Sequence, residues 1–430
     1  MTKKILSVLI ILTILCTSLS GQAIFASNES GTDEIEVSNF DIGQVDAEKV
    51  SAVFLLSDLA NNTDSKWNNG CKIGDIKPLY DFNNNITAYS CQIVNGTVDS
   101  GYIVVSASSD LNPIVEFSYE SKSPSNYVKS ILATQNNTLV EKVYYTGGLD
   151  YFAGLKEKNK NIVNKDFDNK KIDKNDFKNS FKVKKDKLKD NNNAWDSIKK
   201  VDRNSINIMF NAGNNNAGEV ISDPAAYLKN YLGTSNTFTR DANRTKLLDY
   251  VGNWLQTEYE RTGGIGSTTG TGVENCTLSS LSNILIYFSV NGFSKVPSDK
   301  LSIYRTVRAQ AVKLGYTNTD GLSQTKNNNL VDAVWKAFGY TDGSGSNDYV
   351  WTYTSIKSKI DINRPVMLSM ATGQYYNHTI AVRGYTSYSY AMAVYDFLVV
   401  HDNWNKGDRY ISDSETKFGC ATYIYSPTVK

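Results

Sequence analysis

Residues 272–288 read GVENCTLSSLSNILIYF, and this stretch governs the interpretation of the C-terminal half of the chain. Its apolar side chains recur at the spacing of one helical face: Leu278, Leu281, Leu285 and Phe288. The residues before it are rich in Gly and Thr, which favours a loop. The pattern therefore predicts a buried helix with Cys276 at or just inside its N-terminus.

A cysteine at a helix N-terminus has two interpretations. Unpaired backbone N–H groups and the helix dipole favour an anion there, so we expect the pKa of the Cys276 thiol to fall and to yield the nucleophilic thiolate. The same N–H groups can stabilise the oxyanion of an acyl-transfer intermediate. The alternative is a small buried thiol that opens a core helix, and position alone does not separate the two.

The region 205–430 is the largest folded unit that the pattern predicts. Helical periodicity comes first, at 224–232, 242–261, 276–290, 298–314 and 329–338. Strand-like segments follow, at 365–371, 378–385, 395–401, 409–412 and 421–425. Helices followed by a sheet indicate an α+β fold with segregated elements.

The chain has only 2 histidines, which narrows the choice of a general base at neutral pH. His378 opens an apolar strand, from whose end its ring can project into a cleft. Asp402 follows another apolar strand, and its carboxylate can accept a hydrogen bond from the far ring nitrogen of His378. Asp402 is otherwise an ordinary turn residue. Trp404 either shields that hydrogen bond from water or belongs to the core.

These residues form an ordered pattern: a Cys at a helix start, then His378 four residues before Val382 and six before Gly384, then Asp402-x-Trp404. The pattern resembles the papain superfamily and covers Gly264 to Tyr425. The resemblance implies a papain-like α+β domain in which Cys276 is the nucleophile, His378 the base and Asp402 its orienting partner. An Asp at 402 is most similar to the bacterial peptidases that remove double-glycine leaders.

The resemblance is incomplete around the oxyanion hole. Papain-like enzymes carry a Gln shortly before the Cys, whereas this chain has Gly270 there and no Gln between Arg261 and Cys276. Thr277 stands where a Gly often follows. The second oxyanion donor therefore stays open among several candidates: Thr268, Thr269, Asn275 or a backbone N–H. A catalytically inactive domain is a further alternative.

The N-terminus has the pattern of a secretory signal. Lys3 and Lys4 precede an apolar stretch from Ile5 to Cys16, and Ala26 is a small residue at a suitable cleavage point. We therefore expect residues 1–26 to be a signal peptide and the protein to be secreted or associated with the cell surface. An uncleaved anchor or a lipoprotein at Cys16 is the weaker alternative.

Residues 27–150 read as a small α+β domain. A helix is expected from Asp46, followed by strands at 86–94, 101–107 and 114–117. These segments resemble the inhibitory pro-segments of streptopain-type peptidases, which implies a pro-domain that blocks the active site. Cys71 and Cys91 either pair after export or remain two buried thiols.

Residues 151–204 form the third predicted segment, a Lys- and Asn-rich linker. Of the 50 residues from Tyr151 to Lys200, 15 are Lys. Such a composition buries little apolar surface, so we expect a solvated linker with some helix that is readily cut.

Composition narrows the classes of partner that we expect for this chain. The formal net charge is +1, so charge gives no reason to expect nucleic acid. The histidines and carboxylates show no metal-ligand spacing, and no metal, cofactor or mature membrane association is expected. The expected partners are a protein or peptide substrate and the intramolecular pro-domain.

The sequence thus predicts a secreted cysteine endopeptidase made as a zymogen. Two alternatives stay open. One is a cell-wall peptide hydrolase that uses Cys276, His378 and His401. The other is a binding module that kept the fold without catalysis and presents a Tyr-rich surface at Tyr385, Tyr388, Tyr390 and Tyr395.

Overall fold

A computed structural model describes most of the chain. The described residues are 34–37, 39–120, 122–136, 139–149, 151–156, 162–165, 181–210, 220–233, 236–263, 274–370, 378–415 and 418–428. The predicted signal peptide, residues 1–26, lies outside them. The chain divides into the units Met1–Glu34 and Ile35–Lys430, and the elements discussed below belong to the second unit. No helix within the described ranges has the length and apolarity needed to cross a membrane.

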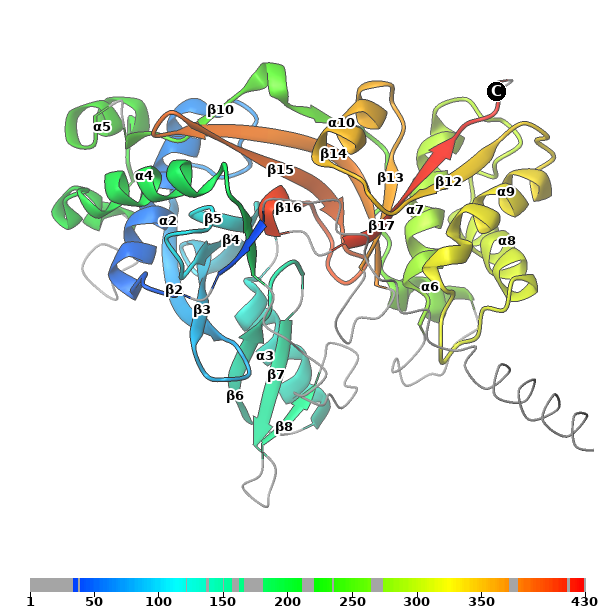
Figure 1. Cartoon of the computed structure of the whole chain (residues 1–430), viewed down its shortest axis with the longest axis horizontal. Helices are drawn as coiled ribbons and strands as arrows, with labels where there is room; N and C mark the ends of the chain where they lie inside the picture. The colour runs from blue at the N-terminus through cyan, green and yellow to red at the C-terminus, as the bar shows by residue number, and fades with distance from the viewer. Residues whose placement is uncertain are drawn as a thin grey trace, which may run out of the picture. The chain divides into compact units, whose positions relative to one another are not determined.

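The N-terminal region is a curled sheet with helices packed against it, antiparallel except for the parallel pair of β2 and β6 (Figure 1). After the short strand β1 (Glu34–Glu36), its elements are α2 (Gln44–Asn61), β2 (Cys71–Tyr80), β3 (Ile86–Asn95), β4 (Val98–Ser106), β5 (Ile114–Ser118), α3 (Pro124–Asn136), β6 (Leu139–Tyr145), β7 (Tyr151–Lys156) and β8 (Ile162–Lys165). The predicted helix and strands of this region are therefore confirmed. Cys71 and Cys91 are buried thiols that face Asn95 and Ile76 in the β2–β3 ladder, not each other.

Short elements connect this region to the C-terminal half. They are β9 (Lys182–Lys184), α4 (Leu188–Lys199), η2 (Arg203–Met209), α5 (Pro224–Tyr231), β10 (Thr239–Arg240), η4 (Ala242–Arg244), β11 (Lys246–Leu247) and α6 (Gln256–Gly263). The long helix predicted at 242–261 is wrong, because Lys246 and Leu247 instead pair with Tyr385 and Gly384 of the main sheet. Within that segment, α-helix begins only at Gln256, and Ala242–Arg244 form a single 3-10 turn.

The C-terminal half is a helical part followed by a sheet, as predicted. Its elements are α7 (Cys276–Val290), α8 (Lys300–Lys313), η5 (Gln324–Lys326), α9 (Asn327–Ala337), β12 (Ser344–Asp348), α10 (Tyr353–Asp361), β13 (Val366–Met370), β14 (Thr379–Tyr390), β15 (Ala393–His401), β16 (Arg409–Ser412), η6 (Asp413–Glu415) and β17 (Phe418–Tyr425). Helix α7 is buried along nearly its whole length and packs on β14. The predicted α+β fold class is confirmed.

The sheets of the two halves are continuous. Strand β16 pairs with β15 on one side and with β5 on the other, where Tyr410 faces Phe117 (Figure 1). The rings of Phe117 and Tyr410 stack with their centroids 4.3 Å apart. Across the same junction Phe54 of α2 packs on Tyr388 of β14. One hydrogen-bonded ladder and one apolar core therefore join the N-terminal region to the C-terminal half.

The tyrosines predicted to form a contact surface lie in the interior. Tyr385, Tyr388, Tyr390 and Tyr395 are all buried. Tyr388 donates a hydrogen bond to Asp58 of α2, and Tyr390 stacks on Phe238. The prediction of a Tyr-rich binding surface is therefore wrong, because other elements cover these rings: α2 covers Tyr388, the segment of Phe238 covers Tyr390, α10 contacts Tyr385 and α4 contacts Tyr395.

Part of the predicted linker is folded. Helix α4 carries Trp195, which is fully buried and donates a hydrogen bond from its indole N–H to the Leu111 carbonyl. Ala194 and Ile198 lie in the same apolar core. The abundance of Lys concealed this short apolar face. The solvated linker predicted for 151–204 therefore needs correction for residues 188–199 and also for β7, which pairs with β6 and buries Tyr151 and Phe152.

Replacing Trp195 with Ala removes a buried indole, so we expect the free energy of unfolding to fall by about 3–5 kcal/mol. The matched control is Lys189→Ala on the exposed face of the same helix, which should change it by less than about 0.5 kcal/mol. Denaturant titration of both variants measures the difference. Equal stability of the two variants would contradict the placement of α4 in the core.

Candidate active site

Helix α7 begins at Cys276 and places this residue beside the start of β14. The Cys276 thiol is hydrogen-bonded to the backbone of Thr379, the residue that follows His378. One residue along the helix, Thr277 Oγ1 lies 3.0 Å from Thr379 Oγ1, and one turn on, Ser280 Oγ donates to the Thr379 carbonyl at 2.6 Å. The structure thus places the predicted nucleophile on the backbone of Thr379, the residue next to the predicted base.

His378 contacts Asp402 through the main chain. His378 Nε2 lies 3.1 Å from the Asp402 carbonyl oxygen. A carbonyl can only accept, so in this contact Nε2 carries the proton and Nδ1 carries the lone pair. The Trp404 ring stacks on the imidazole with the centroids 3.7 Å apart. The ring of His378 is therefore fixed in orientation and shielded by Trp404.

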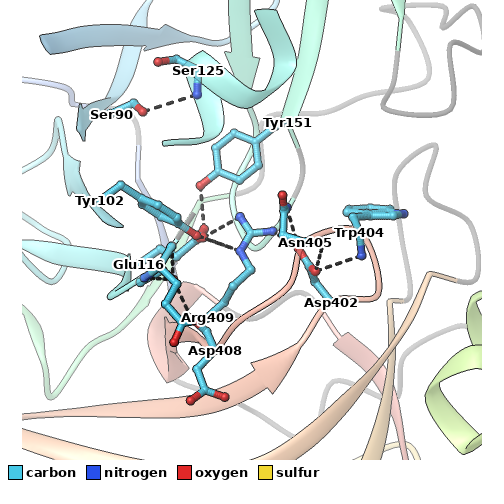
Figure 2. A network of polar contacts seen from close by, with 12 residues as sticks. Ser90, Tyr102, Glu116, Ser125, Tyr151, Asp402, Trp404, Asn405, Asp408 and Arg409 are labelled. Atoms are coloured by element: carbon cyan, nitrogen blue, oxygen red, sulfur yellow. Dashed lines mark hydrogen bonds and ion pairs between the residues drawn. The ribbon is translucent and has the colours of Figure 1, made fainter. Parts of the chain in front are cut away.

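The Asp402 carboxylate makes different contacts. Oδ1 accepts from the backbone N–H groups of Trp404 and Asn405 at 3.0 and 2.8 Å, which is the geometry of a turn residue. Oδ2 forms an ion pair with Arg409 (Figure 2). The sequence predicts a bond from this carboxylate to His378, whereas the contact described here uses the carbonyl of the same residue.

Arg409 links Asp402 to the N-terminal region. Its guanidinium lies 2.6 Å from Glu116 of β5 and donates through Nε to the Tyr102 hydroxyl at 2.8 Å. Tyr151 donates to the second Glu116 oxygen at 2.6 Å (Figure 2). All five side chains are buried. This cluster of Tyr102, Glu116, Tyr151, Asp402 and Arg409, here called the Arg409 network, satisfies two buried carboxylates with one cation.

Burial sets the protonation states at the site. It raises the pKa of the Cys276 thiol to about 12, against small opposing contributions from backbone hydrogen bonds. It lowers the pKa of His378 to about 3, although the Asp402 charge acts the other way. The pKa of Asp402 is below its ordinary value because the Arg409 charge and the Asn405 N–H outweigh its burial. The predicted fall in the thiol pKa does not apply to this form, which holds a neutral thiol and a neutral imidazole.

His401 points to other groups. Its Nδ1 lies 2.7 Å from the Gly252 carbonyl, and its Nε2 lies 3.1 Å from the Asp408 carboxylate. Neighbouring residues of a strand point to opposite faces, as the sequence suggested for His401 and Asp402. These contacts give no support to an arrangement of Cys276 with two histidines.

Sequence reasoning missed Gln256, which opens α6. Its carbonyl accepts a hydrogen bond at 3.3 Å from Nδ2 of Asn275, the residue before Cys276. The second hydrogen of that amide lies toward the Tyr304 hydroxyl at 3.0 Å, so both Asn275 donors are engaged. Thr268, Thr269 and Gly270 lie outside the described residues. The available signal was that Gln256 precedes a Gly/Thr-rich insertion. The length of this insertion separates Gln256 from Cys276 and concealed the signal.

No group of three or more His, Cys, Asp or Glu side chains suited to a metal ion occurs in the described part of the chain. At the start of α7 the structure places a thiol and the first backbone N–H groups of the helix, and a His378 imidazole with a fixed tautomer precedes β14, residue types that suit nucleophilic chemistry.

The lowered pKa of His378 makes stability depend on pH. Below the ordinary value of 6.5 the unfolded chain binds a proton at this ring that the folded chain does not bind until about 3. Stability should therefore be lost as the pH falls from 6.5 towards 3. In His378→Gln this contribution to the loss of stability should vanish. Denaturant titration at several pH values between 6.5 and 3 measures the free energy of unfolding of both proteins. Parallel pH profiles for the two proteins would contradict a buried neutral His378.

Comparisons with known proteins give a partial match. No curated protein matches the sequence. A crystal structure described as a C39-like peptidase from Bacillus anthracis shares 10% identity, with a TM-score of 0.28, over 43% of this chain and 99% of that chain. A fragment of prointerpain A from Prevotella intermedia shares 10% identity, with a TM-score of 0.39, over 81% of this chain and 97% of that chain. TM-scores this low do not establish a shared fold.

The match to a family model is more informative. Residues 256–425 match the Peptidase_C39 like family. The matched segment is less than half of the chain, begins at Gln256, and includes Cys276, His378 and Asp402. The finding supports a cysteine peptidase of papain-like fold.

Proposed function

We propose that the chain is a secreted cysteine endopeptidase made as a zymogen. The observation that carries the proposal is the docking of the α7 tip on β14, which places the Cys276 thiol on the backbone of the residue next to His378. The family match over 256–425 supports the same chemistry. Secretion rests on the signal pattern of residues 1–26.

The proposed reaction is acyl transfer to the thiol. Once the site is open, Cys276 gives its proton to Nδ1 of His378, the nitrogen that the Asp402 carbonyl contact leaves unprotonated, and the resulting thiolate attacks the carbonyl carbon of the scissile peptide bond. His378 then returns the proton to the leaving amine, and a thioester remains. Water, deprotonated by His378, hydrolyses the thioester and restores the thiol. Asp402 orients the imidazole and stabilises its charged form.

The proposed oxyanion hole has two donors. One is the backbone N–H of Cys276 at the start of α7, where helix geometry leaves the first N–H groups unpaired. The other is the side-chain amide of Gln256, because its backbone is bonded to Asn275 beside the nucleophile. Asn275 is less suited to this role, because both of its donors are engaged by Gln256 and Tyr304, while Thr268 and Thr269 lie outside the described residues.

The zymogen proposal rests on three contacts of the N-terminal region with the site. Strand β5 extends the sheet at β16, directly after the loop that carries Asp402 and Trp404. Tyr127 of α3 donates a hydrogen bond to the Trp404 carbonyl at 2.9 Å. Glu116 binds Arg409, which binds Asp402. With Cys276 and His378 both buried, this form is closed to a protein substrate. The region therefore acts as a pro-domain, similar to streptopain-type pro-segments.

One prediction from the proposed function concerns the nucleophile. Purified Cys276→Ala protein should neither cleave a broad protein substrate nor cut its own Lys-rich segment, because the attacking sulfur is missing. Cys420→Ala, which changes another buried cysteine of the same domain, should keep both activities. Gel analysis and fluorescent casein release measure the two readouts. Equal turnover by Cys276→Ala and the unmodified chain would refute this nucleophile, and an inactive unmodified chain would favour the binding module.

Another prediction from the proposed function concerns the Arg409 network. Glu116→Gln removes one partner of a buried ion pair, which costs about 3–5 kcal/mol, so the pro-domain should hold the uncut chain less tightly. We expect a peptidyl thiol reagent to label Cys276 faster in Glu116→Gln than in the unmodified chain. Mass spectrometry measures the labelling rate. The control is Glu120→Gln, which removes an exposed ion pair with Lys66 from the same region. Identical labelling rates in both variants, with the fold intact, would overturn the pro-domain role of Glu116.

A further inference from the structure

We propose that Asn403 is a positioning residue that sets the orientation of the His378 ring relative to Cys276. It acts through the peptide group that it shares with Asp402. The inference deepens the proposed function, because it names what holds the catalytic base. It rests on two observations, the backbone conformation of Asn403 and the bonds of its side chain.

The backbone observation concerns the carbonyl that His378 contacts. The Asp402 carbonyl and the Asn403 N–H belong to one planar peptide group, so the conformations of these two residues aim that carbonyl. Asn403 has φ 64°, in the left-handed region. Asn and Gly adopt this conformation far more readily than other residues. The carbonyl that fixes the His378 tautomer is therefore aimed by an uncommon backbone state at position 403.

The side-chain observation explains how that state is held. Asn403 is buried, and its Nδ2 donates to the Ser280 hydroxyl at 2.7 Å and to the Thr379 carbonyl at 2.9 Å. Its Oδ1 accepts from Asn283 at 3.1 Å. Its own carbonyl accepts from the Gln256 N–H at 3.0 Å. One residue thus bonds to the helix of Cys276, to the strand of His378 and to the start of α6.

The donor and acceptor pattern requires an amide. The Thr379 carbonyl can only accept. Ser280 donates its hydroxyl hydrogen to that carbonyl, so toward position 403 both oxygens act as acceptors and can bond only to a donor. A carboxylate offers no donor and would face the Thr379 carbonyl with like charge. Glycine would keep the backbone state but lose every side-chain bond. Asn403→Asp and Asn403→Gly should therefore both remove the positioning of His378, in different ways.

The role proposed for Asn403 is separate from the role of the Asp402 carboxylate. That carboxylate is engaged by Arg409 and by the turn N–H groups, while the carbonyl of the same residue contacts His378. Asn403 controls the carbonyl, and within the described part of the chain its amide bonds to Ser280, Asn283 and Thr379 and not to the carboxylate or to Arg409. Loss of Asn403 should therefore disturb the imidazole without releasing the Arg409 network.

The test compares Asn403→Asp and Asn403→Gly with a matched control, Asn347→Asp. Asn347 of β12 also uses both ends of its amide, bonding Gln324 and Thr422. The chain has 2 histidines, so nitrogen NMR of the uncut protein labelled in its imidazole rings resolves His378, with His401 as an internal reference. A thermal melt reports the fold, and turnover after the Lys-rich segment is cut reports kcat and KM separately.

We expect both Asn403 variants to lose the single Nε2–H tautomer at His378 while the His401 signals stay unchanged. Because misplacement of a catalytic group costs about 100-fold in rate, kcat should fall by about that factor with little change in KM. Asn347→Asp should match the unmodified chain in both readouts. An unchanged His378 tautomer in folded Asn403→Gly, with kcat within about twofold of the unmodified chain, would overturn the inference.

The NMR readout keeps the two proposals distinguishable. If the unmodified chain shows no peptidase activity, the proposed function fails, but the tautomer shift still tests whether Asn403 positions His378. If Asn403→Asp does not fold, Asn403→Gly decides, because glycine accepts the left-handed backbone. A changed tautomer together with full activity would show that the positioning exists and that catalysis does not need it, which would reject the catalytic role.

Discussion

The docking of helix α7 on strand β14 is the contact on which the rest of the site depends. Thr277 and Ser280 bind the hydroxyl and the carbonyl of Thr379, so the first turn of the helix is fixed to the first residue of the strand. Cys276 and His378 occupy the neighbouring positions on the two elements. Since these elements are buried and hydrogen-bonded to each other, the thiol and the imidazole are placed by the core of the domain and not by mobile loops.

The burial that positions these groups also keeps them inactive in this form. A thiol with a raised pKa and an imidazole with a lowered pKa are both neutral, whereas attack on a peptide bond needs the thiolate. The Arg409 network adds to this state, because the Arg409 charge lowers the pKa of His378 and opposes the effect of Asp402. Under the proposed function, removal of the N-terminal region would expose Arg409 to water and the site to substrate. The same residues would then serve a closed precursor and an open enzyme.

Periodicity in the sequence predicted much of the fold. Helix α7 and strands β14 and β15 are long apolar patterns. The boundaries of α7 and β15 lie within two residues of those predicted, whereas β14 runs on to Tyr390, beyond the predicted end at 385. Trp195 was missed because its short apolar face lies among lysines. The helix at 242–261 was wrong because pairing with β14 overrides local helical preference, and such pairing is invisible in a single segment.

The candidate site was predicted less completely. Residue type and order singled out Cys276 and His378, because a thiol at a helix start and a scarce imidazole have few other uses together. The contacts of Asp402 could not be predicted, since Arg409 and Glu116 are far apart in the chain and meet only through the β5–β16 junction. The role inferred for Asn403 depends on a backbone angle and on bonds to three elements, which no local pattern records.

The central claim is that Cys276 and His378 form one catalytic pair that the N-terminal region keeps neutral. Ultraviolet absorbance of the thiolate tests it most directly, as the difference between the unmodified chain and Cys276→Ala at neutral pH. We predict no difference for the uncut protein, and a thiolate signal after the N-terminal region has been cut off and removed. That signal should disappear on acidification, when the thiolate is protonated. A thiolate in the uncut protein, or none at neutral pH in the separated C-terminal domain, would contradict the account.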